Sequence, residues 1–180
     1  MSPYHIPVLL KEVVEALQVK PGQWYVDATA GGGGHTEAML QAGGQVLAVD
    51  QDQDALQAIA QRLAAYVTSG QLRLVQANFR DLALTVERQS LTEIAGILLD
   101  LGVSSYQLDT PDRGFSFRSA TLDMRMDVTQ PVTAADLLAT LPQRDLAQLF
   151  TDLGEERHAY HFAKVIAQDR QAKPITSGQQ

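Results

Sequence analysis

Four residues carry side chains suited to binding a nucleoside, and each comes directly after an apolar run or within two residues of its end. They are Asp27 after WYV, Asp50 after QVLAV, Phe79 after LRLVQAN and Asp100 after GILL. A carboxylate can accept hydrogen bonds from both hydroxyls of a ribose, and an aromatic ring can stack on an adenine. Taken singly, each is ordinary as a helix-capping aspartate or a core phenylalanine. Their repetition at the ends of successive runs favours one shared site.

A run of four glycines, Gly31 to Gly34, separates Asp27 from His35. Glycines in a turn between a strand and a helix let a phosphate or a nucleotide approach the backbone at the helix N-terminus. The dinucleotide pattern G-x-G-x-x-G/A does not fit, because Thr36 or Glu37 stands at its third small position, and no Gly-Lys-Ser/Thr motif follows. A turn that serves packing alone is the alternative.

Asp50 lies about 20 residues after this turn, the spacing at which an acid binds the ribose of a nucleotide. The glycines are not followed by a lysine that would hold a phosphate. The expected ligand is therefore an adenosine with a bulky uncharged or cationic tail, and S-adenosylmethionine fits this description.

The elements that position these residues follow from the alternation of apolar runs with helical patterns. Strands are expected over 45–50, 72–79 and 96–102, a strand running into a turn over 24–31, and helices over 8–17 and 51–66. Strands that alternate with helices predict a doubly wound α/β sheet. In such a sheet, ligands bind at the carboxyl ends of the strands, which is where the four residues stand.

The pattern changes after residue 105, first to a long ordered loop of turn residues, aromatics and mixed charge, and then to helices. Thr133 and Asp136 have the spacing of a capping box. Helices are expected over 143–153 and 155–169, with Gly154 as the C-cap between them.

Composition narrows the possible classes of protein. The chain has 180 residues, 45% of them hydrophobic, no cysteine and a formal net charge of −7. It has no disulfide, which fits a reducing cytoplasm, and its acidity argues against a general nucleic-acid coat. Charges interrupt the apolar N-terminus early, so neither a signal peptide nor a membrane span is expected. No metal site is assigned: His35 is expected to start a helix, and His158 and His161 to lie on a solvated helix face.

Several motifs together resemble the RsmH/MraW family. They are HIPVLLKEVVEAL, DATAGGGGHT, GILLDLGVSSYQLD, RGFSF and LDMRMD, and the resemblance runs from about residue 4 to residue 178. It implies a Rossmann-like class I methyltransferase sheet, present here in its first four strands, with part of an inserted helical domain. The expected divisions are a cofactor-binding part over 1–107, a substrate-side loop over 108–130 and the helical insertion over 131–180.

The resemblance also implies an activity and a set of cofactor contacts. Members of the family use S-adenosylmethionine to methylate N4 of a P-site cytidine in the decoding centre of 16S ribosomal RNA, within the small ribosomal subunit. The implied cofactor contacts are Gly33, Gly34, His35, Asp50, Phe79, Asp100 and Gln107. Of these, Asp50, Phe79 and Asp100 also follow from the strand ends, whereas His35 and Gln107 rest on the resemblance alone.

Methyl transfer to an exocyclic amine needs alignment of nitrogen, methyl and sulfur, and an acceptor near the amine. Asp100 is the candidate acceptor, although the family makes it a cofactor contact first. On the substrate side, Arg113 and Arg125 are candidate phosphate contacts, and Phe115 is a candidate for stacking on the base, as are Phe117 and Tyr106, with Arg118 as a further phosphate contact. The alternative is that these aromatics pack the loop and that the arginines pair with acids of the same loop, Asp109, Asp112, Asp123 and Asp127.

Members of the family are considerably longer, and a complete sheet of this class has more strands than the four expected here. The fourth strand is then an apolar edge that needs a partner, and the chain by itself is expected to bind cofactor with little or no turnover. Two other functions stay open: a methyltransferase acting on a small molecule or a protein, and a non-catalytic fragment. A dinucleotide oxidoreductase is disfavoured by the glycine spacing. The oligomeric state does not follow from the sequence.

Overall fold

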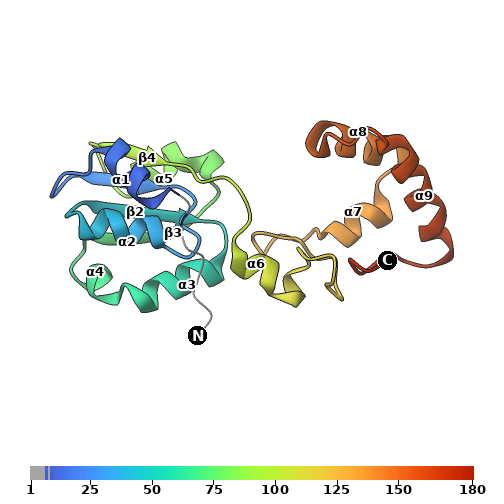
Figure 1. Cartoon of the computed structure of the whole chain (residues 1–180), viewed down its shortest axis with the longest axis horizontal. Coiled ribbons are helices and arrows are strands. Elements are labelled where there is room, and N and C mark those ends of the chain that lie inside the picture. Colours follow the sequence, from blue (N-terminus) through green and yellow to red (C-terminus); the bar gives the residue numbers. More distant parts are fainter. Residues whose placement is uncertain (1–6, 8) are drawn as a thin grey trace. The chain divides into compact units, whose positions relative to one another are not determined.

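The computed structural model describes residue 7 and residues 9–180, which form two compact units, the first ending at Tyr106 and the second spanning Gln107–Gln180 (Figure 1). Each unit is described by itself. The division of the second unit at residue 130 stays a prediction.

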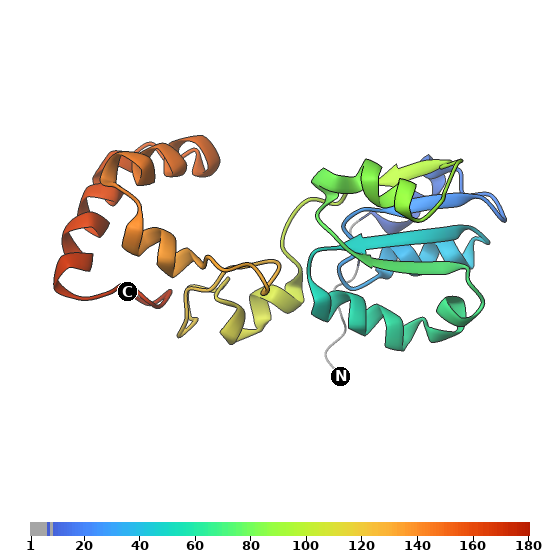
Figure 2. The same ribbon diagram turned by 180° about the vertical axis from the view of Figure 1, so that it is seen from behind.

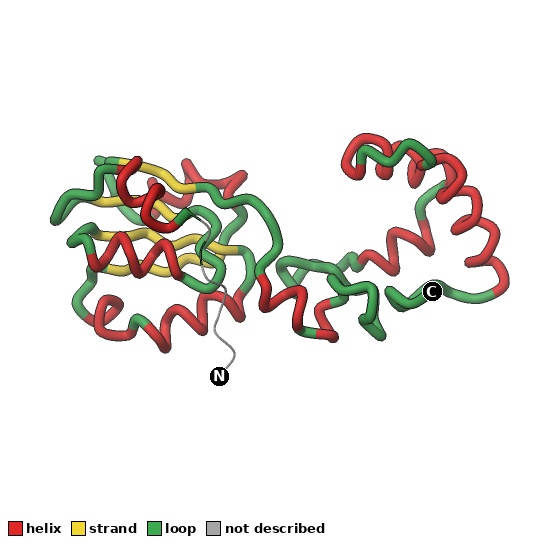
Figure 3. The backbone as a smooth tube through the Cα atoms, in the orientation of Figure 1, coloured by secondary structure: helices red, strands yellow, loops and turns green. Residues whose placement is uncertain are grey.

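The first unit is an α/β unit in which strands alternate with helices (Figure 3). Its elements are α1 (Leu10–Leu17), β1 (Trp24–Asp27), α2 (Gly34–Gln41), β2 (Gln45–Asp50), α3 (Gln53–Arg62), α4 (Ala64–Thr68), β3 (Leu72–Gln76), the 3-10 turn η1 (Phe79–Asp81), α5 (Leu82–Arg88) and β4 (Gly96–Leu98). The expected helix over 51–66 is divided at Leu63, which is the C-cap of α3 and the N-cap of α4.

The four described strands form one parallel sheet in the order β3-β2-β1-β4, with Val26 of β1 opposite Leu47 of β2 and Ile97 of β4. This confirms the predicted α/β class with a Rossmann-like parallel sheet. The chain crosses from β3 to the far side of β1 to form β4, so the strand order reverses between β1 and β4. The carboxyl ends of strands at such a switch point are the usual place for a ligand.

Helices cover both faces of the sheet because side chains alternate along each strand. On one face, Tyr25 and Val46 pack with residues of α2 and α3, such as Met39 and Ile59. On the other face, Val26, Leu47 and Val49 meet Leu82 and Val86 of α5. Figure 1 shows α1 and α2 in front of the strands, and Figure 2, from behind, shows α5 on the opposite side. These two apolar layers fix the strand ends that carry the candidate site.

β4 is an end strand of the described sheet, and the residues in and after it are exposed. Ile97 is 49% exposed, Leu99 49% and Leu101 70%. The expected strand over 96–102 is correspondingly short, because the backbone beyond Leu98 forms no ladder with β1. The edge therefore has the apolar character that the sequence indicated, and a partner for it stays a prediction.

The second unit is helical. Its elements are α6 (Ser105–Asp109, which spans the boundary between the units), the 3-10 turn η2 (Pro111–Arg113), α7 (Ala134–Thr140), α8 (Gln143–Gly154) and α9 (Ala159–Ala172). The capping box of Thr133 and Asp136 is confirmed at the start of α7. Gly154 as a C-cap is wrong by one residue: it lies in the last turn of α8, and Glu155 takes the left-handed position with φ +49°. Arg170 donates to the carbonyls of Leu138 and Leu141 at 2.6 and 2.7 Å and so ties α9 to the end of α7.

No helix in the described part of the chain combines the length and the apolar character that crossing a membrane requires.

Candidate cofactor site and substrate-side loop

The end of β2 and the glycine turn are joined by the side chain of Asp50. Its Oδ2 accepts a hydrogen bond of 2.7 Å from the N–H of Gly31, and its Oδ1 accepts one of 2.9 Å from the N–H of Asp52. Burial raises the pKa of this carboxyl, and the two backbone donors partly offset that rise. Because each carboxylate oxygen has two lone pairs, acceptor capacity is left for the hydroxyls of a ribose.

Two different constraints favour glycine in the turn: a positive φ angle at some positions and a lack of space for a Cβ atom at others. Gly31 and Gly33 have φ of +50° and +75°, which disfavour other residues. A Cβ on Gly33 would lie 2.7 Å from Cγ1 of Ile59, and one on Gly34 would collide with the ring of Pro7. A Cβ on Gly31 would meet only the carbonyl of Thr29, at 3.9 Å. The packing alternative thus accounts for Gly33 and Gly34, whereas Gly31 has open space beside it.

Arg62, which the sequence analysis did not single out, holds this turn from α3. Its guanidinium donates to the carbonyl of Gly32 and to Oε2 of Glu37, both at 2.6 Å. No local sequence signal points to this role, because the contact depends on how α3 packs beside α2.

Asp27, at the end of β1, is buried beneath the turn. It is 1% exposed, so it does not line the open rim that the strand ends predicted. Its Oδ2 accepts a hydrogen bond of 2.7 Å from the hydroxyl of Thr36, while its buried Oδ1 has no hydrogen-bond partner in the described residues. Burial raises the pKa of this carboxyl to about 6, against the lowering effects of the Thr36 hydroxyl and of His35.

Asp100 and His35 meet at the switch point between β1 and β4. Nδ1 of the buried His35 lies 4.0 Å from Oδ2 of Asp100, and the Asp100 side chain is half exposed. The N–H of Asp100 donates to the hydroxyl of Thr29 at 2.7 Å, which links the chain after β4 to the chain after β1. The Asp100 carboxylate therefore lies at the switch point, with the imidazole of His35 beside it.

Phe79 follows β3 and begins the 3-10 turn η1, which Asn78 caps through its side chain. The ring is 42% exposed. Asp50 thus ends β2, and Phe79 and Asp100 follow β3 and β4 within three residues, at the strand ends that the sequence predicted. Gln107 is buried in α6 and belongs to the second unit.

The loop after η2 uses its two candidate arginines internally. Arg113 is buried, and its Nη2 donates to the carbonyls of Arg125 and Met126 at 3.0 and 3.1 Å. Arg125 forms a two-pronged pair with Asp123, at 2.8 and 2.6 Å. Its Nη1 also donates to the carbonyls of Val128 and Gln130. These hydrogen bonds hold the pKa of Asp123 below its usual range. The Arg125–Asp123 pair is the alternative that the sequence left open, whereas Arg113 binds backbone carbonyls of the loop. A substrate role for either arginine stays a prediction.

The aromatics of the same loop differ in exposure. Phe115 is partly buried, whereas Phe117 is 92% exposed. Gly114, between η2 and Phe115, has φ +79°, and a Cβ there would lie 2.6 Å from the N of Asp123. The first three residues of the motif RGFSF, 113–115, therefore pack within the loop, whereas its last residue, Phe117, is exposed.

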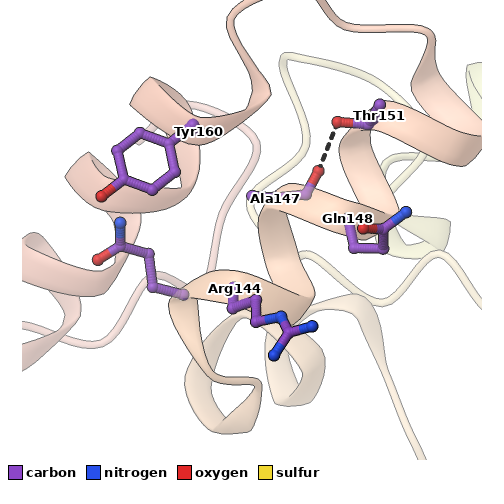
Figure 4. A pocket seen from close by; sticks show the side chains of 6 residues that line it. Arg144, Ala147, Gln148, Thr151 and Tyr160 are labelled. Carbon is purple, nitrogen blue, oxygen red and sulfur yellow. Dashed lines mark hydrogen bonds between the residues drawn. The ribbon is translucent and has the colours of Figure 1, made fainter.

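A surface hollow of about 490 Å³ lies on the helical unit (Figure 4). It is lined by Gln143, Arg144, Ala147, Gln148, Thr151 and Tyr160. The figure shows the Thr151 hydroxyl turned to the carbonyl of Ala147, a contact of 2.9 Å. The lining includes none of the predicted site residues. Among residue 7 and residues 9–180, no three His, Asp or Glu side chains gather as a metal site would require.

Comparison with known proteins finds relatives that are similar in sequence to this chain. It is 48% identical over 175 residues to the ribosomal RNA small subunit methyltransferase H of Carboxydothermus hydrogenoformans, covering 96% of this chain and 56% of that protein. It is 44% identical to the protein of the same name from Symbiobacterium thermophilum, covering 99% and 57%. The chain thus spans about half the length of the curated relatives it matches.

A crystal structure from Clostridium thermocellum whose name includes "rRNA-methylase" aligns with a TM-score of 0.41 and 16% identity, covering 74% of this chain and 67% of that chain. A structural similarity this low does not support a conclusion about this chain. The sequence model of the MraW methylase family, in contrast, matches residues 2–180. The chain, whose motifs resemble that family, belongs to the MraW methylase family.

Proposed function

We propose that this chain is the S-adenosylmethionine-binding part of an enzyme that methylates 16S ribosomal RNA of the small ribosomal subunit, at N4 of a P-site cytidine in the decoding centre. The observation that carries the proposal is the Asp50 carboxylate held against Gly31, at the end of β2 and beside open backbone. Family membership and the names of the relatives support the reaction class and the RNA substrate.

The residues present fit this cofactor. Asp50 would accept the ribose hydroxyls, Phe79 would stack on the adenine, and the open backbone at Gly31 would admit the tail. Gly33, Gly34, His35, Asp100 and Gln107 are the further contacts that the family resemblance implies. Bound there, the cofactor supplies an electrophilic methyl group on a sulfonium.

The chain's own part in the chemistry would be positioning and proton acceptance. The cytidine amine is a weak nucleophile, because its lone pair is delocalised into the ring. Asp100 is half exposed at the switch point, so its carboxylate would accept a hydrogen bond from that amine and make the lone pair available. His35, 4.0 Å behind it, would hold the carboxylate in place.

Because the chain spans about half the length of its relatives, we propose binding without substantial methyl transfer for residues 1–180 by themselves. An isolated fragment that only binds is therefore the second candidate function, and the exposed β4 edge favours it. A methyltransferase acting on a small molecule or a protein is the third. Where ribosomal RNA is the substrate, the place of action is the cytoplasm.

The test combines binding with transfer. S-adenosylmethionine is titrated calorimetrically into the chain, and radiolabelled methyl transfer is then measured onto small ribosomal subunits that lack the modification, beside a pool of metabolites and proteins. We expect binding, and any transfer to appear only on the subunits. Transfer to the pool instead would overturn the RNA substrate, and absence of binding by the folded chain would overturn the cofactor role.

A further inference from the structure

Phe117 is the most exposed large hydrophobic side chain in the described part of the chain, at 92%. Its neighbours in the chain are the polar residues Ser116 and Arg118, and the next residues are Ser119 and Ala120. A protein-docking surface would gather several apolar side chains, as the β4 edge does. A single exposed aromatic ring such as that of Phe117 is suited to a ligand that stacks on it with one flat face.

Hydrogen bonds hold the backbone on both sides of Phe117. The N–H of Ser119 donates to the carbonyl of Ser116 at 2.9 Å, and Ser119 is fully buried. From the end of the chain, the N–H of Gly178 donates to the carbonyl of Ser119 at 3.1 Å, and Nε2 of Gln179 donates to the carbonyl of Arg118 at 3.1 Å. A Cβ on Gly178 would lie 2.7 Å from the carbonyl oxygen of Ser116, so the two segments are in close contact. The ring is thus presented by a braced loop.

The charges around Phe117 point the same way. Arg113 and Arg125 direct their guanidinium groups into the loop. Arg118 is exposed and, within residue 7 and residues 9–180, its guanidinium has no acidic partner. An aromatic face followed directly by an unpaired cation matches a nucleotide, whose base offers the flat face and whose phosphate offers the charge.

We propose that Phe117 stacks on an unpaired RNA base and that Arg118 contacts the adjoining phosphate. This rests on the proposed function, which supplies RNA as the substrate class, and names the residues that hold it. An unpaired base lacks a stacking neighbour, and an aromatic ring can take that place. The assignment differs from the expectation for Phe115, which is partly buried.

The test measures binding of the full chain to a short hairpin RNA with an unpaired loop, by fluorescence anisotropy at one fixed salt concentration. Phe117→Ala and Phe117→Leu are each expected to weaken binding by about 5- to 150-fold, the range for loss of one base–aromatic stack. Phe117→Trp is expected to bind at least as well as the wild type, with its added tryptophan emission quenched by the RNA. Phe162→Ala, an exposed aromatic on α9, is the control and is expected to bind as the wild type does.

The outcomes separate the two proposals. Wild-type binding that Phe117→Ala leaves unchanged would overturn the stacking proposal and leave the RNA substrate standing. Loss with alanine but not with leucine would show an apolar contact instead of a stack, and equal loss with Phe162→Ala would show a non-specific effect; either overturns the proposal. A wild-type chain that is folded and does not bind the RNA would count against the proposed function itself.

Discussion

The Oδ2 atom of Asp50 and the backbone N–H of Gly31 meet at 2.7 Å, although they lie 19 residues apart in the sequence. The contact joins the end of β2 to the turn that follows β1. The residue expected to bind the ribose is therefore also the residue that shapes the glycine turn.

Replacing Asp50 should weaken ribose binding and also disturb the glycine turn. Asp50→Ala removes the ribose acceptor and leaves the N–H groups of Gly31 and Asp52 without it. We expect the affinity for S-adenosylmethionine to fall by at least about tenfold, about 1.4 kcal/mol. Calorimetric titration measures it, with Asp54→Ala, at an exposed carboxylate on α3, as the control. Equal affinity of the wild type and Asp50→Ala would contradict the assignment.

Gly33 can be tested against a glycine of nearly equal conformation. Gly33 and Gly70 have φ of +75° and +77°, but a Cβ on Gly33 would meet Ile59 at 2.7 Å, whereas one on Gly70 would meet nothing within 4 Å. Gly70→Ala should lose about 1–2 kcal/mol for the left-handed conformation alone. Gly33→Ala should lose about 1–3 kcal/mol more, because Ile59 must move. Urea denaturation of both variants measures the difference, and equal losses would exclude the packing role.

The buried Asp27 predicts a pH dependence of stability. Burial raises the pKa of its carboxyl from 3.8 to about 6, so between these values the folded chain holds a proton that the unfolded chain has released. The free energy of unfolding therefore falls through this group as the pH rises from about 4 to about 6, by about 3 kcal/mol at most.

Asp27→Asn should remove that dependence. Relative to this variant, the wild type should lose stability on going from about pH 4 to about pH 7, as followed by urea denaturation. Asp145→Asn, which removes an exposed carboxylate on α8, is the control. A constant difference between the wild type and Asp27→Asn over this range would show that the carboxyl does not titrate as the burial implies.

We expect the hydrogen bonds of Arg125 to keep the substrate-side loop in one conformation. Its fork binds both oxygens of Asp123 and two loop carbonyls, and lysine cannot reproduce this set of hydrogen bonds. In Arg125→Lys, the amides of Ala134 and Ala135, which donate to the carbonyls of Asp123 and Leu122, should exchange with deuterium faster. Arg144→Lys, on the surface of α8, should leave these rates unchanged. Unaltered exchange in Arg125→Lys would mean that the loop is held by other contacts.

The sequence was sufficient for the position of each strand, because strands follow from local patterns, although β1, β3 and β4 end three or four residues before their expected bounds. The run QVLAVD matches β2 residue for residue, and strand alternation alone places Asp50, Phe79 and Asp100 at one edge. β4 is shorter than its apolar run, because apolarity records burial in a complete sheet and does not record which backbone is paired.

Contacts that depend on tertiary packing were out of reach of the sequence. The burial of Asp27 beneath the glycine turn and the hydrogen bond of Arg62 to that turn arise from tertiary packing, and no spacing in the sequence encodes them. Whether Arg113 turns inward or outward depends on the carbonyls that the folded loop offers it, so the sequence could only state both alternatives.

The ends of the described chain both lie against an element proposed to bind a ligand. Pro7 packs on Gly34 of the glycine turn, and Gly178 packs on Ser116 of the loop that presents Phe117. Pro7→Ala and Gly178→Ala would therefore each disturb one of the two proposed sites without changing a residue proposed to touch a ligand.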